Sequence, residues 1–138
     1  MTAKAFLGQA YRLDQQITNK ISTLDALNDL AFKTTATMSG MPGSPNRDKQ
    51  TMADTIDKII DLQEDINRVI DRLVDLKRTM YEAFANIDNI DYRLILESRY
   101  LCNKSWPEIA VDMDYNLRHL YRMHDSALME AEKFLPLH

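Results

Sequence analysis

The sequence predicts an all-α protein, built as a long antiparallel helical hairpin with coiled-coil-like packing and followed by a small helix-turn-helix module. Its 138 residues include three Gly and four Pro, which leaves little material for β-turns. Apolar residues recur three and four positions apart along two long stretches, as they do on one face of a helix. A third stretch, residues 105–128, carries the signals of two short helices joined by a tight turn. We therefore expect the hairpin over residues 1–88 and the module over residues 89–138.

The first long helix is expected over about residues 4–37. Its main apolar stripe consists of Phe6, Ala10, Leu13, Ile17, Leu24, Leu27 and Ala31. Gly8 weakens this helix, because glycine is a poor helix former. The segment 39–47 then contains two of the three Gly and two of the four Pro. We expect this segment to be the loop that reverses the chain.

The second long helix has the most regular pattern in the sequence. Its main stripe keeps a three-four alternation at Met52, Thr55, Ile59, Leu62, Ile66, Val69, Leu73, Leu76, Met80, Ala83 and Ile87. A second stripe lies beside it, at Ile56, Ile60, Ile70, Val74 and Phe84. Because one helix cannot cover both stripes, the first helix should leave one of them for the module or for another copy of the protein. We expect a homodimer formed through the long helices.

The module should begin with a supporting helix and a second helix packed on it. Asp91 is the expected N-cap of the supporting helix, with Ile90 and Ile95 placed as a hydrophobic staple. Ser105 and Glu108 form a capping box, in which the Ser105 hydroxyl accepts from the Glu108 amide and the Glu108 side chain returns to the Ser105 amide. The second helix is therefore expected to start at Ser105.

A tight turn and a longer helix complete the module. Asp114 tolerates the left-handed conformation that such a turn needs, and Asn116 is a good N-cap for the helix that follows. That helix has an apolar inner face and a cationic outer face. We expect it to continue to about Phe134, because Pro136 stops it.

The outer face of the last helix has the chemistry needed to read DNA. A recognition helix enters the major groove with its N-terminal turns, where Arg118 and Arg122 can bind guanine and Asn116 can reach adenine or a phosphate. Amides at the start of the preceding helix can hold a backbone phosphate. The candidate DNA-binding residues are Lys104, Ser105, Asn116, Arg118, His119, Arg122 and Ser126. The alternative is a three-helix fold whose surface arginines are merely solvated.

The charge balance limits any DNA binding. The chain has a formal net charge of −4, and the segment from Asp91 onward has six Lys and Arg against eight Asp and Glu. Nucleic-acid-binding domains are commonly basic. Binding must therefore come from a local patch, and we expect it to be weak for each protomer and to be lost quickly with added salt.

The residues needed for catalysis or metal binding do not gather in the sequence. Cys102 shares the module with His119 and His124, but a lone cysteine beside aromatic residues is usually a packed residue. The two histidines are five residues apart on one helix, so they point to different faces and make a poor metal site. We expect no enzymatic site, no cofactor and no metal.

Hydropathy and cysteine content indicate the cellular compartment. No stretch approaches the apolar length needed to cross a bilayer, and the N-terminal residues are too polar for a signal peptide. The single Cys102 cannot form an internal disulfide, which suits a reducing environment. We expect a cytoplasmic protein with no membrane partner.

Two resemblances suggest a function. The segment 99–128 resembles region four of bacterial primary sigma factors, matching it at Arg99-Tyr100, Trp106, Glu108-Ile109-Ala110, Asn116, Leu120 and Ala127-Leu128. The segment 43–128 is similar to a family of small proteins encoded by phages and prophages of Gram-positive bacteria, in the strings Met52-Ala53-Asp54, Lys58-Ile59-Ile60-Asp61-Leu62, Leu96-x-x-Arg99-Tyr100-Leu101 and Ser105-Trp106-x-Glu108-Ile109-Ala110. Asp114 stands where sigma-type motifs usually have Gly. Related ArpU and RinA-type proteins activate phage late genes, so the resemblance implies transcription regulation.

Three functions follow as hypotheses. The first is a DNA-binding transcriptional regulator that reads double-stranded DNA with the helix beginning at Asn116. The second is a protein-interaction module, because region four of sigma factors also contacts RNA polymerase and an uncovered apolar stripe suits a protein partner. The third is a structural or packaging role in phage assembly.

Overall fold

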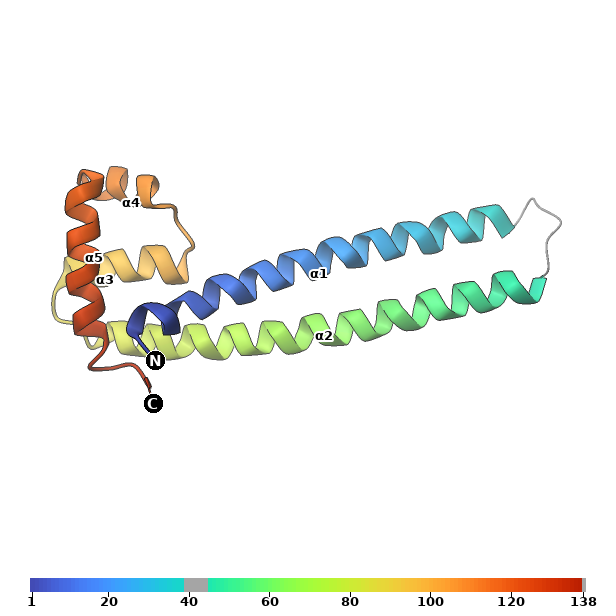
Figure 1. Cartoon of the computed structure of the whole chain (residues 1–138), viewed down its shortest axis with the longest axis horizontal. Coiled ribbons are helices and arrows are strands. Elements are labelled where there is room, and N and C mark those ends of the chain that lie inside the picture. Colours follow the sequence, from blue (N-terminus) through green and yellow to red (C-terminus); the bar gives the residue numbers. More distant parts are fainter. Residues whose placement is uncertain (39–44, 138) are drawn as a thin grey trace. The chain divides into compact units, whose positions relative to one another are not determined.

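The protein is all-α. The computed structural model describes the backbone of residues 1–38 and 45–137 and the side chains of residues 1–33 and 50–137. Its helices, shown in Figure 1, are α1 (Ala3–Met38), α2 (Pro45–Ala85), α3 (Ile90–Leu96), a π-helical turn (Glu97–Leu101), α4 (Trp106–Met113) and α5 (Leu117–Ala131). Within the described residues, no helix is long and apolar enough to cross a membrane.

The chain forms two compact units. One unit, Asp14–Asp71, contains most of the two long helices. The other combines Met1–Leu13 with Arg72–His138, so the start of α1 and the end of α2 belong with the three short helices. The sequence predicts a boundary near residue 88. In the structure, the ends of the long helices share a core with the helices that follow that residue.

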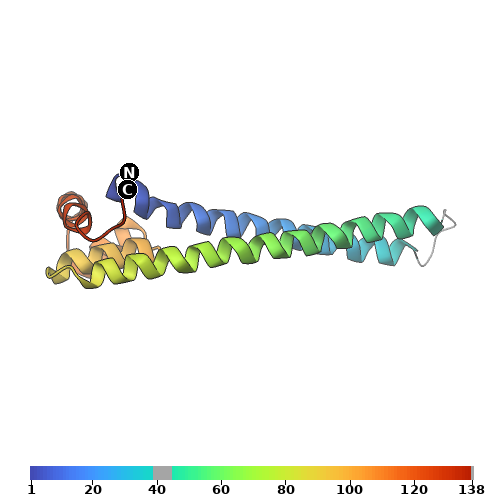
Figure 2. The same ribbon diagram turned by 90° about the horizontal axis from the view of Figure 1, so that it is seen from below.

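In the Asp14–Asp71 unit, α1 and α2 lie antiparallel to each other (Figures 1 and 2). The predicted main stripe of α2 faces inward here, with Thr55, Ile66 and Val69 buried. Lys20 of α1 donates a hydrogen bond to Asp65 of α2, and this contact lowers the pKa of the Asp65 carboxyl. The packing is therefore the seam that the three-four pattern predicts.

The second stripe of α2 is divided between burial and exposure. Phe84 is fully buried and belongs to the core of the other unit. Exposed fractions between 37% and 50% remain on the other four members of the stripe, Ile56, Ile60, Ile70 and Val74. Part of the stripe is thus covered by the C-terminal helices, as the sequence allowed, and part is uncovered in the single chain.

The unit formed by the two chain ends has two apolar clusters. The larger one joins α1, α2, α3 and α5 through Ala3, Leu7, Ala10, Met80, Ala83, Phe84, Ile87, Leu96, Tyr100, Ala127, Ala131 and Leu135. Its members include two alanines on α1 and two on α5. The termini meet at the same end, where the Met1 amino group donates to the Leu137 carbonyl at 3.3 Å (Figure 2).

Two predicted details of the supporting helix are wrong. The N-cap of α3 is Asn89, whose side chain accepts from the Tyr92 amide at 3.1 Å. Asp91 lies in the first turn, where a carboxylate also suits the helix dipole. Ile90 is 66% exposed while Ile95 is buried, so these two residues do not form a staple. Asparagine and aspartate cap equally well, so sequence preference did not distinguish the two positions.

Two predicted helix boundaries also shift. Pro45 begins α2, so residues 45–47 are helical; the rest of the predicted loop, 39–44, lies outside the described residues. Proline is well suited to a first helical position because its missing N–H needs no partner there. At the other end, α5 stops at Ala131 instead of near Phe134. The chain tightens into turns there and brings Leu135 into the larger cluster.

Candidate nucleic-acid interface

The candidate interface is built on α4, α5 and the short turn between them. Asp114 ends α4 in the left-handed conformation, with φ of 56° and ψ of 43°. The Tyr115 amide then donates back to the Ala110 carbonyl at 2.9 Å. This bond and the one from the Asp114 amide to the Val111 carbonyl, at 3.2 Å, satisfy carbonyls at the end of α4 where the chain turns sharply into α5. The left-handed turn is where the sequence places it.

Both helices start at the predicted capping residues. The Ser105 hydroxyl accepts from the Glu108 amide at 3.3 Å, and Pro107 lies in the first turn of α4. Asn116 caps α5 by accepting from the His119 amide at 2.8 Å. Each cap fixes where its helix begins, and therefore which residues of α5 point outward.

A small apolar cluster holds the helices in this arrangement. Ile95 from α3, Ile109 and Ala110 from α4, and Leu120 from α5 are buried together. Met113, Tyr115 and Met123 pack around them. Because Leu120 is completely buried, the opposite side of α5 must face solvent.

Arg118 and Arg122 occupy that solvent-facing side, with His119 beside them, while Asn116 lies at the N-cap of the helix. Asn116, Arg118, His119 and Arg122 are all exposed. Arg118 and Arg122 are four residues apart, so they lie one turn apart on the same face. The His119 ring contacts Tyr115 edge-on, with ring centroids 4.5 Å apart. All four residues are thus accessible at the start of α5, and the two arginines lie side by side there.

The other three candidate residues are less accessible. Lys104, Ser105 and Ser126 are half-buried. Lys104 donates to the Asp112 carboxylate at 3.0 Å, and this hydrogen bond raises the pKa of the lysine. A phosphate at this position would have to compete with Asp112 for the lysine.

A buried polar pair lies on the inner side of α5. The Tyr100 hydroxyl and His124 Nε2 are hydrogen-bonded at 2.8 Å. Burial lowers the pKa of His124 to about 4 and raises the pKa of Tyr100 to about 12, so both side chains are neutral near pH 7. His124 is therefore a structural residue of the core.

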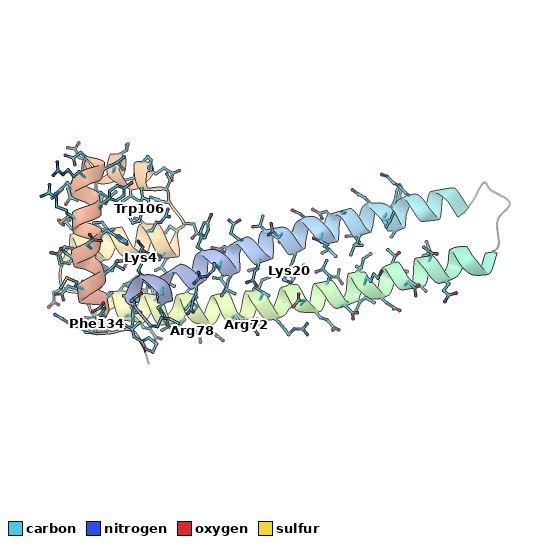
Figure 3. The ribbon with its side chains drawn as sticks, in the orientation of Figure 1. Lys4, Lys20, Arg72, Arg78, Trp106 and Phe134 are labelled. Atoms are coloured by element: carbon cyan, nitrogen blue, oxygen red, sulfur yellow. The ribbon has the colours of Figure 1, made fainter. Side chains whose placement is uncertain are left out.

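Beside this pair lies a cavity of about 600 Å³. Lys4, Arg12 and Arg99 supply its basic side chains, and Tyr11, Tyr100, Trp106 and Tyr121 its aromatic rings. Figure 3 marks Lys4 and Trp106, which line it from different helices. No site was predicted here from the sequence. The available signal is the spacing of Lys4, Gly8, Tyr11 and Arg12, which places these four residues along one side of α1.

No family model, no curated protein and no solved structure matches the chain. The resemblance to sigma region four and to the phage protein family therefore stays a prediction. What the molecule itself presents is a pair of short helices, a sharply defined turn and an exposed, arginine-bearing face on the second helix.

Proposed function

We propose that this protein is a sequence-specific DNA-binding regulator of phage or prophage transcription, acting in the cytoplasm. It would place the first turns of α5, beginning at Asn116, in the major groove of double-stranded DNA. One observation carries the proposal. Arg118 and Arg122 are exposed one turn apart near the start of α5, while Leu120 fixes the rotation of that helix from the buried side.

The chemistry of this face suits base recognition. An arginine guanidinium can donate two parallel hydrogen bonds to O6 and N7 of guanine, each such pair contributing about 1–3 kcal/mol of discrimination. Asn116 and His119 add polar side chains at the same end of the helix. Lys104 and Ser105 would approach the phosphate backbone, once Lys104 leaves Asp112.

Two copies of the chain would bind together. The acidic net charge of −4 makes the electrostatic attraction of one copy for DNA small. The uncovered residues Ile56, Ile60 and Ile70 on α2 favour a homodimer through the long helices. A dimer would pair two recognition helices on a two-fold site and so compensate for weak individual contacts.

The test compares two double variants of the full chain. Binding sites are first selected from random double-stranded DNA with the wild-type protein, and affinity is then measured by fluorescence anisotropy at several salt concentrations. Arg118→Ala with Arg122→Ala should weaken specific binding at least about tenfold, from the loss of two base contacts. The melting temperature should stay unchanged, because both side chains are exposed.

The matched control is Arg72→Ala with Arg78→Ala. These two arginines are also exposed but lie on α2 (Figure 3). The control removes the same net charge, but from residues outside the base-contacting helix, so it should leave specific affinity within about twofold. Equal losses in both double variants would mean that binding follows total charge only. Selection that enriches no sequence would reject the proposal.

A protein-docking role is the second candidate. The observation that favours it is the exposed apolar surface of the module, where Val111 of α4 is 80% exposed and Met129 of α5 is 69% exposed. RNA polymerase or a phage assembly protein would be the partner. If selection enriches no DNA, purified RNA polymerase should instead bind the wild-type chain and lose affinity with Val111→Glu.

A further inference from the structure

The cavity beside α5 lies apart from the exposed arginine face. Tyr121, His124 and Asp125 line it from α5, while Arg118 and Arg122 do not. Its other walls come from the first turns of α1 and from the segment around Tyr100 and Trp106. All these residues belong to the unit that combines the two chain ends. Its volume of about 600 Å³ is within the usual range for small-molecule sites.

The aromatic wall of the cavity is held by contacts among its own rings. Trp106 meets Tyr121 edge-on at 5.7 Å between ring centroids, and meets His124 at 4.5 Å. The hydrogen bond between the Tyr100 hydroxyl and His124 Nε2 fixes the next ring. Of these rings, Tyr100 is buried, while Trp106 and the half-exposed Tyr121 line the cavity and give it an aromatic side against which a planar heterocycle can pack.

The charged groups of the cavity favour an anion. Lys4, Arg12 and Arg99 contribute three positive charges, against one carboxylate from Asp125. The Arg99 guanidinium lies 4.7 Å from the centre of the Trp106 ring and donates to the Lys104 carbonyl, so it is positioned without losing its charge. Lys4 and Arg12 are eight residues apart on α1, on the same side of the helix.

Gly8 keeps the α1 wall open between these two cations. A Cβ atom built on Gly8 would meet nothing within 4 Å. Close packing therefore does not require glycine at this position, although glycine is unfavourable inside a helix. The residue leaves space beside Lys4 and Arg12 that a bound phosphate could fill.

We propose that this cavity binds a nucleoside 5′-phosphate. The base would stack against the Trp106 and Tyr121 side, and the phosphate would lie between Lys4 and Arg12. The Asp125 carboxylate can accept hydrogen bonds from ribose hydroxyls. The cavity thus combines aromatic rings for a base, a carboxylate for ribose hydroxyls and basic side chains for a phosphate. A nucleotide carries all three of these groups.

The test uses the fluorescence of Trp106, which is the only tryptophan in the chain. The full-length protein is titrated with each of the four ribonucleoside 5′-monophosphates, with the matching nucleosides and with inorganic phosphate. At least one monophosphate should change the emission saturably. Its nucleoside should bind at least about tenfold more weakly, because it lacks the charge-assisted hydrogen bonds.

Three variants locate the binding. Arg12→Ala should weaken the monophosphate at least about fivefold and leave the nucleoside unchanged, because only a phosphate contact is lost. Gly8→Leu should weaken both ligands by filling the cavity. Arg78→Ala removes an exposed arginine on α2 and should change neither.

Three results would overturn the proposal. They are no saturable signal with any monophosphate, equal affinity for a monophosphate and its nucleoside, or the same loss in Arg78→Ala as in Arg12→Ala. Arg12 is exposed, so its variant should fold even if Gly8→Leu does not. The titration contains no DNA, so its outcome is independent of whether α5 reads a DNA sequence.

Discussion

Single residues show how position in the fold decides the role of a side chain. Arg99, Arg118 and Arg122 have the same chemistry, but Arg99 is held against Trp106 and a backbone carbonyl while the other two extend into solvent. His119 and His124 differ in the same way. His119 is exposed at the start of α5, whereas His124 is only 5% exposed and is bonded to Tyr100. The five-residue spacing of these histidines predicts their divergence; the partner of His124 comes from the packing of α5 on the segment before α4.

The buried His124 should make stability depend on pH. Its folded pKa is lowered to about 4, whereas histidine in an unfolded chain titrates near 6.5. The unfolded state therefore binds a proton more readily between these values. The stability contributed by neutral His124 is complete above pH 6.5 and is lost as the pH falls toward 4.

This prediction can be checked against His124→Gln, which removes the titrating group but keeps a side chain able to bond Tyr100. Wild-type stability should fall more steeply than that of the variant between pH 7 and 4 in urea unfolding. Carboxylates titrate in both proteins and cancel in the comparison. Parallel curves would show that His124 is protonated equally in the folded and unfolded states.

At the scale of elements, α4 and α5 are defined by local chemistry. Ser105 and Asn116 cap their helices as the sequence predicts, and Asp114 adopts the expected left-handed conformation. Each of these interactions joins residues within a few positions of one another, so short sequence patterns contain the information. The start of α3 shows the limit of this reasoning, because Asn89 and Asp91 are equally good caps by residue type and the structure uses Asn89.

The turn between α4 and α5 gives a prediction at this scale. Asp114→Val should destabilise the protein by about 1–2 kcal/mol, because a β-branched residue at a φ of 56° is strained. Asp114→Gly should be neutral or slightly stabilising, since glycine adopts this conformation without a steric cost. Urea unfolding of both variants measures the difference.

The order of the two Asp114 variants is the informative result. If Asp114→Val were as stable as Asp114→Gly, the left-handed turn would not be formed in solution. In that case the rotation of α5 relative to α4 would have to be set by the apolar cluster alone.

At the scale of the whole chain, the two long helices present apolar surface that their own packing does not cover. Ile21 and Leu30 of α1, like Ile56 and Ile60 of α2, have exposed fractions of 43% or more. Ile60 lies on the second stripe of α2, beside the seam that packs on α1. The proposed function requires a second copy of the chain to cover this apolar surface.

A charge placed on the second stripe should prevent that association. Ile60→Glu is expected to shift the protein from dimer to monomer in sedimentation velocity, because a carboxylate would be desolvated in the interface. Gln50→Glu adds the same charge on another side of α2 and should leave the dimer intact. A wild-type chain that sediments as a monomer at all concentrations would remove the long helices from the proposed function as a dimerisation surface.

Sequence patterns alone predict the all-α fold, the approximate course of the long helices, the caps at Ser105 and Asn116 and the turn at Asp114. These features depend on periodicity and on interactions between near neighbours, and short stretches of sequence contain both. Packing between distant segments joins the start of α1 and the end of α2 to the C-terminal helices, and it buries Phe84 while Ile60 stays exposed. It also decided the cavity, whose walls come from residues more than 80 positions apart, such as Lys4 and Trp106. Contacts between distant parts of the chain depend on how the helices pack, and neither periodicity nor capping chemistry specifies that packing.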